Sequence, residues 1–200
     1  MRFVFFLWFA LVSVVGGIHR VLYGPRARAR KRLRDAPREL TDGAVVTLTG
    51  VVRAKGEMLT APLSGREAVA FSSTARIYAG EGYYRHLADS FHQQQMVDFV
   101  LETKDAIVEI ESAAAELEYA PEPLIPRKIE REQAFLRAAG SNVHARSASF
   151  DEVVIAPGMK ISIQGVVRIE IAGAESYRET GKRIVLAGHP AHPLTIGRPI

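Results

Sequence analysis

This chain of 200 residues contains no cysteine. It can therefore form no disulfide, offers no thiolate nucleophile, and cannot hold zinc or an iron–sulfur cluster through cysteine. Acidic residues are also absent from residues 1–34, which carry eight lysines and arginines, whereas residues 35–200 carry 18 basic and 22 acidic side chains. The net charge of +4 thus combines a strongly basic amino-terminal segment with a mildly acidic remainder.

Long apolar runs are scarce, and the most prominent one lies at residues 3–18, which contain no charged side chain. An α-helix continued to Tyr23 would extend about 31 Å, close to the hydrocarbon thickness of a bilayer. We therefore predict a transmembrane anchor over residues 1–23. A cleaved signal peptide and a buried core helix are the alternatives, but most of the basic charge follows the apolar run, and no small-residue cleavage site comes after it.

Basic residues follow the apolar run and define a membrane-surface flank within residues 24–43. The basic side chains of this flank are Arg26, Arg28, Arg30, Lys31, Arg32 and Arg34. Basic segments beside membrane helices tend to stay in the cytoplasm and attract anionic lipid headgroups. We expect a single-pass protein with its amino terminus outside and its domain facing the cytoplasm. Nucleic-acid binding is the alternative for this cluster, but no aromatic residue alternates with the arginines, so we expect no nucleic-acid partner.

Residues 44–200 have the pattern of a mainly β domain. Alternating and β-branched segments predict strands at 44–54, 66–79, 96–103, 106–111, 113–119, 149–158, 159–172 and 182–188. Residues 80–95 predict a loop or a hairpin excursion. One helix is expected over residues 126–140, because Ile129, Gln133 and Leu136 recur at helical spacing and Gly140 suits a helix end. We expect a β-barrel or a β-sandwich-like domain with one short helix.

Two segments of this domain repeat one pattern. Residues 46–53 read VTLTGVVR and residues 161–168 read ISIQGVVR, each with aliphatic residues at alternate positions and glycine at the fifth. Glycine permits a bulge or sharp bend in a strand, and such bends allow a small sheet to close into a barrel. An internal duplication of two half-units, 44–119 and 145–200, is one explanation of the repeat, and chance is the other.

Two longer segments carry a family resemblance. The runs GVVRAKGEMLTAPLSGREAVAF (50–71) and FDEVVIAPGMKISIQGVVR (150–168) resemble the membrane-flanked domain of the GIDE family. The resemblance covers residues 45–199 and implies a domain beside a transmembrane helix that binds or senses partners, with ubiquitin transfer assigned to a separate RING finger. A RING needs eight cysteine or histidine ligands for zinc, so these 200 residues cannot form one.

Residues with catalytic or metal-binding chemistry form no recognisable motif. The candidates are Ser64, Ser72, Ser73, His86, His92, His189, His192, Glu109, Glu111, Glu116 and Glu118. The serines lack a nucleophile elbow and a companion base, and the histidine pairs supply at most half a metal site. The glutamates alternate with aliphatic residues, as on the solvated face of a sheet. We expect no catalytic residue, metal or cofactor.

The most aromatic polar segment of the domain predicts a partner-binding loop. Its residues are Tyr83, Tyr84, His86, Phe91 and His92. Aromatic residues are enriched at binding hot spots, although rings that cap a barrel are the alternative. We expect a membrane-anchored, non-catalytic binding or scaffolding module of the GIDE type that contacts the bilayer and a protein partner. An E3 ubiquitin ligase-family role by homology, or a place as a subunit of a membrane enzyme complex, is the alternative.

Overall fold

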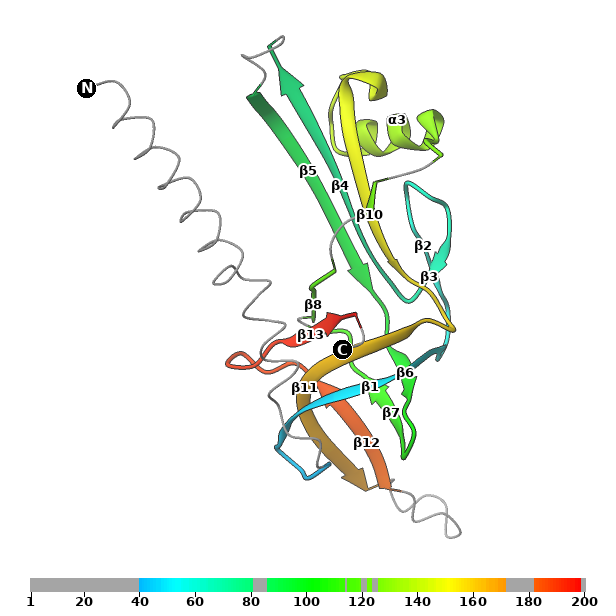
Figure 1. Ribbon diagram of the computed structural model, residues 1–200, viewed down its shortest axis with the longest axis vertical. Helices are drawn as coiled ribbons and strands as arrows, with labels where there is room; N and C mark the ends of the chain where they lie inside the picture. Colours follow the sequence, from blue (N-terminus) through cyan, green and yellow to red (C-terminus); the bar gives the residue numbers. More distant parts are fainter. Residues whose placement is uncertain are drawn as a thin grey trace, which may run out of the picture.

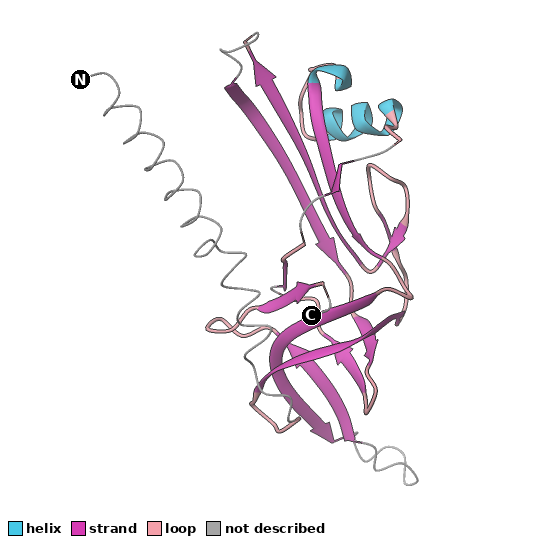
Figure 2. Ribbon diagram, in the orientation of Figure 1, coloured by secondary structure: helices cyan, strands magenta, loops and turns pink. Residues whose placement is uncertain are grey.

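The computed structural model describes residues 40–80, 86–113, 115–119, 122–123, 126–171 and 182–198. Strands dominate these residues and form a closed five-stranded barrel, a four-stranded sheet and a short two-stranded hairpin (Figure 1). One α-helix accompanies them in the described residues, beside the four-stranded sheet (Figure 2). The prediction of a mainly β domain with a barrel and one short helix is therefore confirmed.

The elements follow one another along the chain with these bounds. They are β1 (Val45–Ala54), β2 (Leu59–Thr60), β3 (Glu67–Ala68), β4 (Ala70–Ala79), β5 (His86–Met96), β6 (Phe99–Glu102), β7 (Ile107–Ile110), β8 (Ala115–Leu117), β9 (Glu122–Pro123), α3 (Ile129–Ala138), the 3₁₀-helix η2 (Ala145–Ser147), β10 (Ala148–Ile155), β11 (Lys160–Ile171), β12 (Lys182–Ala187) and β13 (Leu194–Gly197). Short β13 and β9 were not predicted from the sequence.

The barrel closes in the order β1, β6, β7, β12, β11 and back to β1. Within this ring β7 and β12 run parallel, and the other neighbours run antiparallel. The fourth strand of the ring in chain order returns to lie beside the first, which is the Greek-key connection. A five-stranded Greek-key barrel is the architecture of the OB-fold. β13 and β8 extend the sheet outward from β11.

The two repeated GVVR segments pair with each other inside the barrel wall. β1 and β11 are antiparallel, and the register is centred on Leu48 opposite Ile163, which are the third residues of the two repeats. The two glycines are symmetric about that centre, and backbone and leucine atoms of neighbouring strands occupy the space that a side chain there would need. A Cβ on Gly50 would lie 2.9 Å from Leu101 Cγ, and one on Gly165 would lie 2.7 Å from Leu194 Cδ1. Glycine at these positions therefore allows the barrel to fill.

The four-stranded sheet has the order β5, β4, β10, β9 and takes its strands from both of the predicted half-units. Helix α3 covers one face of it. Phe135 and Leu136 of the helix lie in one apolar cluster with Ala75 of β4 and Phe150 of β10. The helix ends in a Schellman motif at Gly140, whose φ is +79°, and the Ser141 N–H donates to the Leu136 carbonyl at 2.9 Å.

An ion pair with a buried carboxylate fastens α3 to the sheet. Glu132 is fully buried, and its carboxylate accepts three hydrogen bonds from Arg127, the shortest at 2.6 Å. The same guanidinium donates to the Ala145 carbonyl at 2.8 Å and lies 5.6 Å from the centre of the Phe150 ring. This arginine satisfies the buried carboxylate, so the helix end, η2 and β10 are held together.

Most of the individual elements predicted from the sequence are confirmed, and the main difference lies in residues 86–96. Most predicted strands and the helix are present, and the hairpin around Lys104 and Asp105 is formed by β6 and β7. For residues 80–95 the loop alternative is wrong from His86 onward, and the hairpin alternative is confirmed there, because the chain forms the long strand β5 antiparallel to β4. Backbone pairing with β4 explains this difference, because residues of low β-propensity are held extended by an established neighbour.

The predicted anchor, residues 1–23, lies outside the described residues. So do Arg26, Arg28, Arg30, Lys31, Arg32 and Arg34 of the basic flank, and only residues 40–43 of the flank are described. Within the part of the chain that the structure describes, no helix combines the length and apolarity needed to cross a membrane.

Candidate protein-binding surface

Strand β5 forms one edge of the four-stranded sheet. It pairs with β4 along one side, and no strand of the described residues pairs with its other side. None of its eleven residues is buried. With β4 it forms a long arm that extends away from the barrel (Figure 1). The Ser90 N–H donates to Asp89 Oδ1 at 2.8 Å. Apart from that group, an edge of this length leaves a row of backbone N–H and C=O groups available to another strand.

The edge of β5 lacks most of the features that protect sheet edges. Its sequence, HLADSFHQQQM, contains no lysine, arginine, proline or glycine, and Asp89 is the one residue with a formal charge at neutral pH. The opposite edge of the same sheet differs, because β9 has two residues and one of them is Pro123. Shortness and proline both discourage pairing, whereas β5 is long and unprotected apart from a register irregularity near its start.

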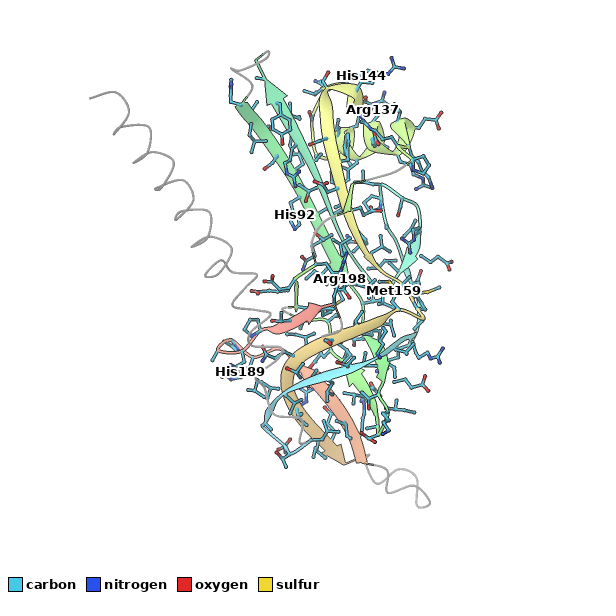
Figure 3. The ribbon with its side chains drawn as sticks, in the orientation of Figure 1. His92, Arg137, His144, Met159, His189 and Arg198 are labelled. Carbon is cyan, nitrogen blue, oxygen red and sulfur yellow. The ribbon has the colours of Figure 1, made fainter. Side chains whose placement is uncertain are left out.

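The face of this sheet opposite α3 is polar. His92, Thr74 and Asp151 lie side by side on β5, β4 and β10. The Thr74 hydroxyl lies 3.1 Å from His92 Nδ1, and Arg76 forms an ion pair with Asp151 at 2.6 Å. Figure 3 shows His92 on the side of the sheet away from the helix that carries Arg137. In a catalytic triad the aspartate binds the histidine directly and orients it as the base. Here Thr74 lies between His92 and Asp151, so these residues do not form a triad.

Three of the five predicted partner-binding residues are described, and all three lie on β5. His86 and His92 are exposed, whereas Phe91 faces the helix side and packs against its apolar cluster. Tyr83 and Tyr84 lie outside the described residues. The predicted loop is thus replaced by a strand whose residues point to two faces. Residues 86–96 carry no alternating apolar pattern, so only the pairing with β4 identifies this strand and its open edge.

The serines considered as nucleophiles have structural roles or lack a base. Ser73 is fully buried, and its hydroxyl donates to Glu152 at 2.8 Å. The same carboxylate accepts the backbone N–H groups of Leu63 and Ser64, each at 2.9 Å. Glu152 therefore fixes the 61–65 turn on the sheet. It also joins the two segments that carry the GIDE resemblance, since the turn belongs to the first segment and Glu152 to the second.

A charged cavity of about 220 Å³ lies on the outside of the barrel, beside the parallel pair β7 and β12. Its lining residues are Asp98, Glu109, Ile110, Glu111, Arg168, Glu170, Arg183 and Val185. Both arginines are already paired: Arg183 donates to Glu109, and Arg168 donates to Glu170 at 2.9 Å. The charged side chains that line the cavity therefore form an ion-pair network beside the parallel strands β7 and β12. The four carboxylates of this network would repel the phosphate groups of a nucleic acid.

Hydrogen bonds to the charged forms lower the pKa of two carboxyl groups of this cavity. The hydrogen bond from Arg183 is the main cause that lowers the pKa of Glu109, and Lys55 adds to it. The backbone N–H of Ser112 lowers the pKa of Asp98. Both groups are therefore held as carboxylates, and neither is suited to act as a general acid at neutral pH.

The four histidines considered as metal ligands do not form a ligand set. His189 and His192 pair through their backbones at 2.9 and 2.8 Å, and His189 Nδ1 accepts from the Ala191 N–H. Figure 3 shows His189 well separated from His92. Across the described residues no group of three or more metal-binding side chains occurs. The acidic side chains are also divided, because Glu109 lies on β7 and Glu116 on β8.

Comparison with known proteins adds no relative to this picture. No protein-family model, no curated protein and no solved structure matches the chain. The GIDE resemblance therefore stays a prediction from the two sequence segments that carry it.

Proposed function

We propose that this protein is a non-catalytic binding or scaffolding module of the GIDE type, anchored to a membrane by residues 1–23. In this proposal the basic flank lies on anionic headgroups, the amino terminus is outside, and the domain faces the cytoplasm. The domain binds an extended segment of a partner protein along β5. The single observation that carries the proposal is the long, unprotected edge of β5.

Strand addition is the binding mode that fits this edge. A partner segment would satisfy the open backbone groups of β5, which supplies affinity without a deep pocket. Side chains of the partner would contact His92 and Ser90 on the polar face and the exposed Leu87, and these contacts would supply specificity. A binding role is also favoured over a catalytic one by the contacts of the candidate catalytic residues. Ser73 is hydrogen-bonded to Glu152, His189 and His192 pair through their backbones, and Glu109 is hydrogen-bonded to Arg183.

The binding surface can be tested with a photo-crosslinking amino acid at Ser90, introduced into the full chain in its native membranes. We expect a crosslinked protein product at Ser90 and little at Ala138 on the exposed face of α3. Adding Ala88→Lys and Gln95→Lys should reduce the yield about tenfold, because lysines protect sheet edges. The matched control, Ala134→Lys with Ala138→Lys, adds the same charge to exposed helix positions and should leave the yield unchanged. Equal yields from the Ser90 and Ala138 probes would exclude β5 as the binding surface.

The membrane topology has its own test. A reporter that is active only in the cytoplasm, fused after Ile200, should be active because the basic flank stays on that side. A reporter that is active only after export serves as the control and should stay silent. The reverse pattern would overturn the proposed orientation while leaving the binding surface untouched.

A further inference from the structure

The open edge of β5 can pair with the same edge of a second copy of the chain. We propose that two copies of this chain pair through β5, antiparallel and in a register centred on Phe91, to form one continuous eight-stranded sheet. This inference rests on the proposed function and names the partner as a second copy. A two-fold interface joins the same surface of both copies, and two-fold dimers are the commonest homo-oligomers.

The side chains of β5 favour this register. Antiparallel pairing about Phe91 places Phe91 opposite its own copy, Ser90 opposite His92, and Asp89 opposite Gln93. The ring pair adds apolar contact beside the helix cluster that Phe91 already touches. A serine hydroxyl and an imidazole, and a carboxylate and an amide, are hydrogen-bonding partners, and each of these pairs occurs twice. A shift that centres the register on Ser90 would instead oppose Asp89 and Phe91.

Charge also permits the pairing. Asp89 is the one formally charged residue of β5. In the proposed register the two Asp89 side chains are four residues apart along the strands, about 13 Å, which exceeds the screening length of about 8 Å at physiological ionic strength. Arg76, which lies opposite Ser90 on the neighbouring strand β4, is already paired with Asp151. No like charges therefore meet across the interface.

The absence of native cysteine makes the register directly testable by single substitutions in the full chain, kept in detergent micelles. Directly opposed residues have Cα atoms about 4.5–5.5 Å apart, within the range of a disulfide. Phe91→Cys should therefore crosslink under mild oxidation about tenfold more than Ala138→Cys on the helix. Because Phe91→Cys removes a ring from the helix cluster, a second test mixes Ser90→Cys copies with His92→Cys copies. The mixture should form a hybrid disulfide that neither variant forms alone.

The oligomeric state provides the independent measurement. Light scattering of the micelles, with the detergent contribution subtracted, should give a protein mass of two chains for the wild type and of one chain for Ala88→Lys with Gln95→Lys. The Ala134→Lys and Ala138→Lys control should remain a dimer. A monomeric wild type, or a dimer that crosslinks at Ala138 and not at Phe91, overturns the inference. If the wild type is monomeric while the Ser90 photo-probe still captures a different protein, the dimer falls and the proposed binding surface stands. If both fail, both are refuted.

Discussion

Gly50 provides the sharpest test of how the barrel is packed. A Cβ at this position would lie 2.5 Å from the carbonyl oxygen of Glu102, whereas ordinary contact begins at 3.4 Å. The Gly50→Ala variant can therefore form only if β6 moves away from β1 by about 0.9 Å, or if the strand bends by an equivalent amount. Because the obstacle is backbone held in a ladder, and not the end of a flexible side chain, the strain cannot be relieved by a rotamer change.

The expected loss in the free energy of unfolding depends on the contacts that β6 makes in the barrel. β6 joins β1 through four register pairs, and its residues Phe99 and Leu101 are fully buried in the barrel. Overpacking of a core costs about 1–3 kcal/mol, and contact with fixed backbone places Gly50→Ala in the upper half, about 2–3 kcal/mol. With a urea slope of about 2 kcal/mol per molar, the unfolding midpoint should fall by about 1–1.5 M.

Urea unfolding of the full chain in micelles, followed by circular dichroism, measures this change. Gly56→Ala is the matched control, because a Cβ there meets nothing within 4 Å, and it should alter the free energy of unfolding by less than about 0.5 kcal/mol. Gly165→Ala should fall between the two, since the nearest atom, Leu194 Cδ1 at 2.7 Å, is the end of a side chain, and the backbone oxygen of Ala187 is farther away, at 3.0 Å. A Gly50→Ala midpoint indistinguishable from that of Gly56→Ala would refute the account of the barrel interior.

Three further predictions concern buried polar groups. Burial raises the pKa of Tyr119 to about 12, so its neutral form stabilises the folded state below about pH 10, and that stability is lost as the pH rises toward 12; Tyr119→Phe should remove this loss in urea unfolding compared at about pH 9 and about pH 11. Glu132→Ala should cost about 2–3 kcal/mol in the same assay, less than for a fully buried pair because the Arg127 left behind is 42% exposed; a loss below 0.5 kcal/mol would show that the pair does not hold α3. Glu152→Ala should cost about 2–4 kcal/mol and speed amide exchange at Leu63, because it leaves buried donors without an acceptor; unchanged exchange there would contradict the role of Glu152 in fixing the turn.

Local patterns in the sequence were sufficient for most of the secondary structure. Alternation and β-branched residues predicted β1, β4 and β11. The buried residues of β4 keep the period of two, whereas residues 161–165 of β11 are buried on both faces. The helix was predicted from its spacing and from Gly140, whose positive φ is the conformation a Schellman motif requires. The GVVR repeat predicted barrel bends at two glycines. What it could not predict is that the two repeats pair with each other, 115 positions apart.

The candidate binding surface was harder to find. Phe91 and His92 were singled out as neighbours in a loop, but strand geometry sends them to opposite faces of a sheet, one into the helix cluster and one to the polar side. Strand β5 has no apolar alternation of its own, so only its pairing with β4 makes it extended. Whether a strand lies at the edge of a sheet depends on how all the other strands of that sheet pair, so the sequence of β5 alone cannot show that its edge is open.

Composition and local pattern were enough to establish the absence of cysteine chemistry, the separation of basic and acidic segments, and the period of the strands and the helix, because these depend only on residue types and on neighbours within a few residues. The tertiary structure alone decided the closed strand order, the symmetric pairing of the repeats, the burial of Glu132 and Glu152, and the exposed edge of β5. These features arise from contacts between residues far apart in the chain. Such contacts form only once the whole domain has folded, because no local segment can hold them against the loss of chain entropy.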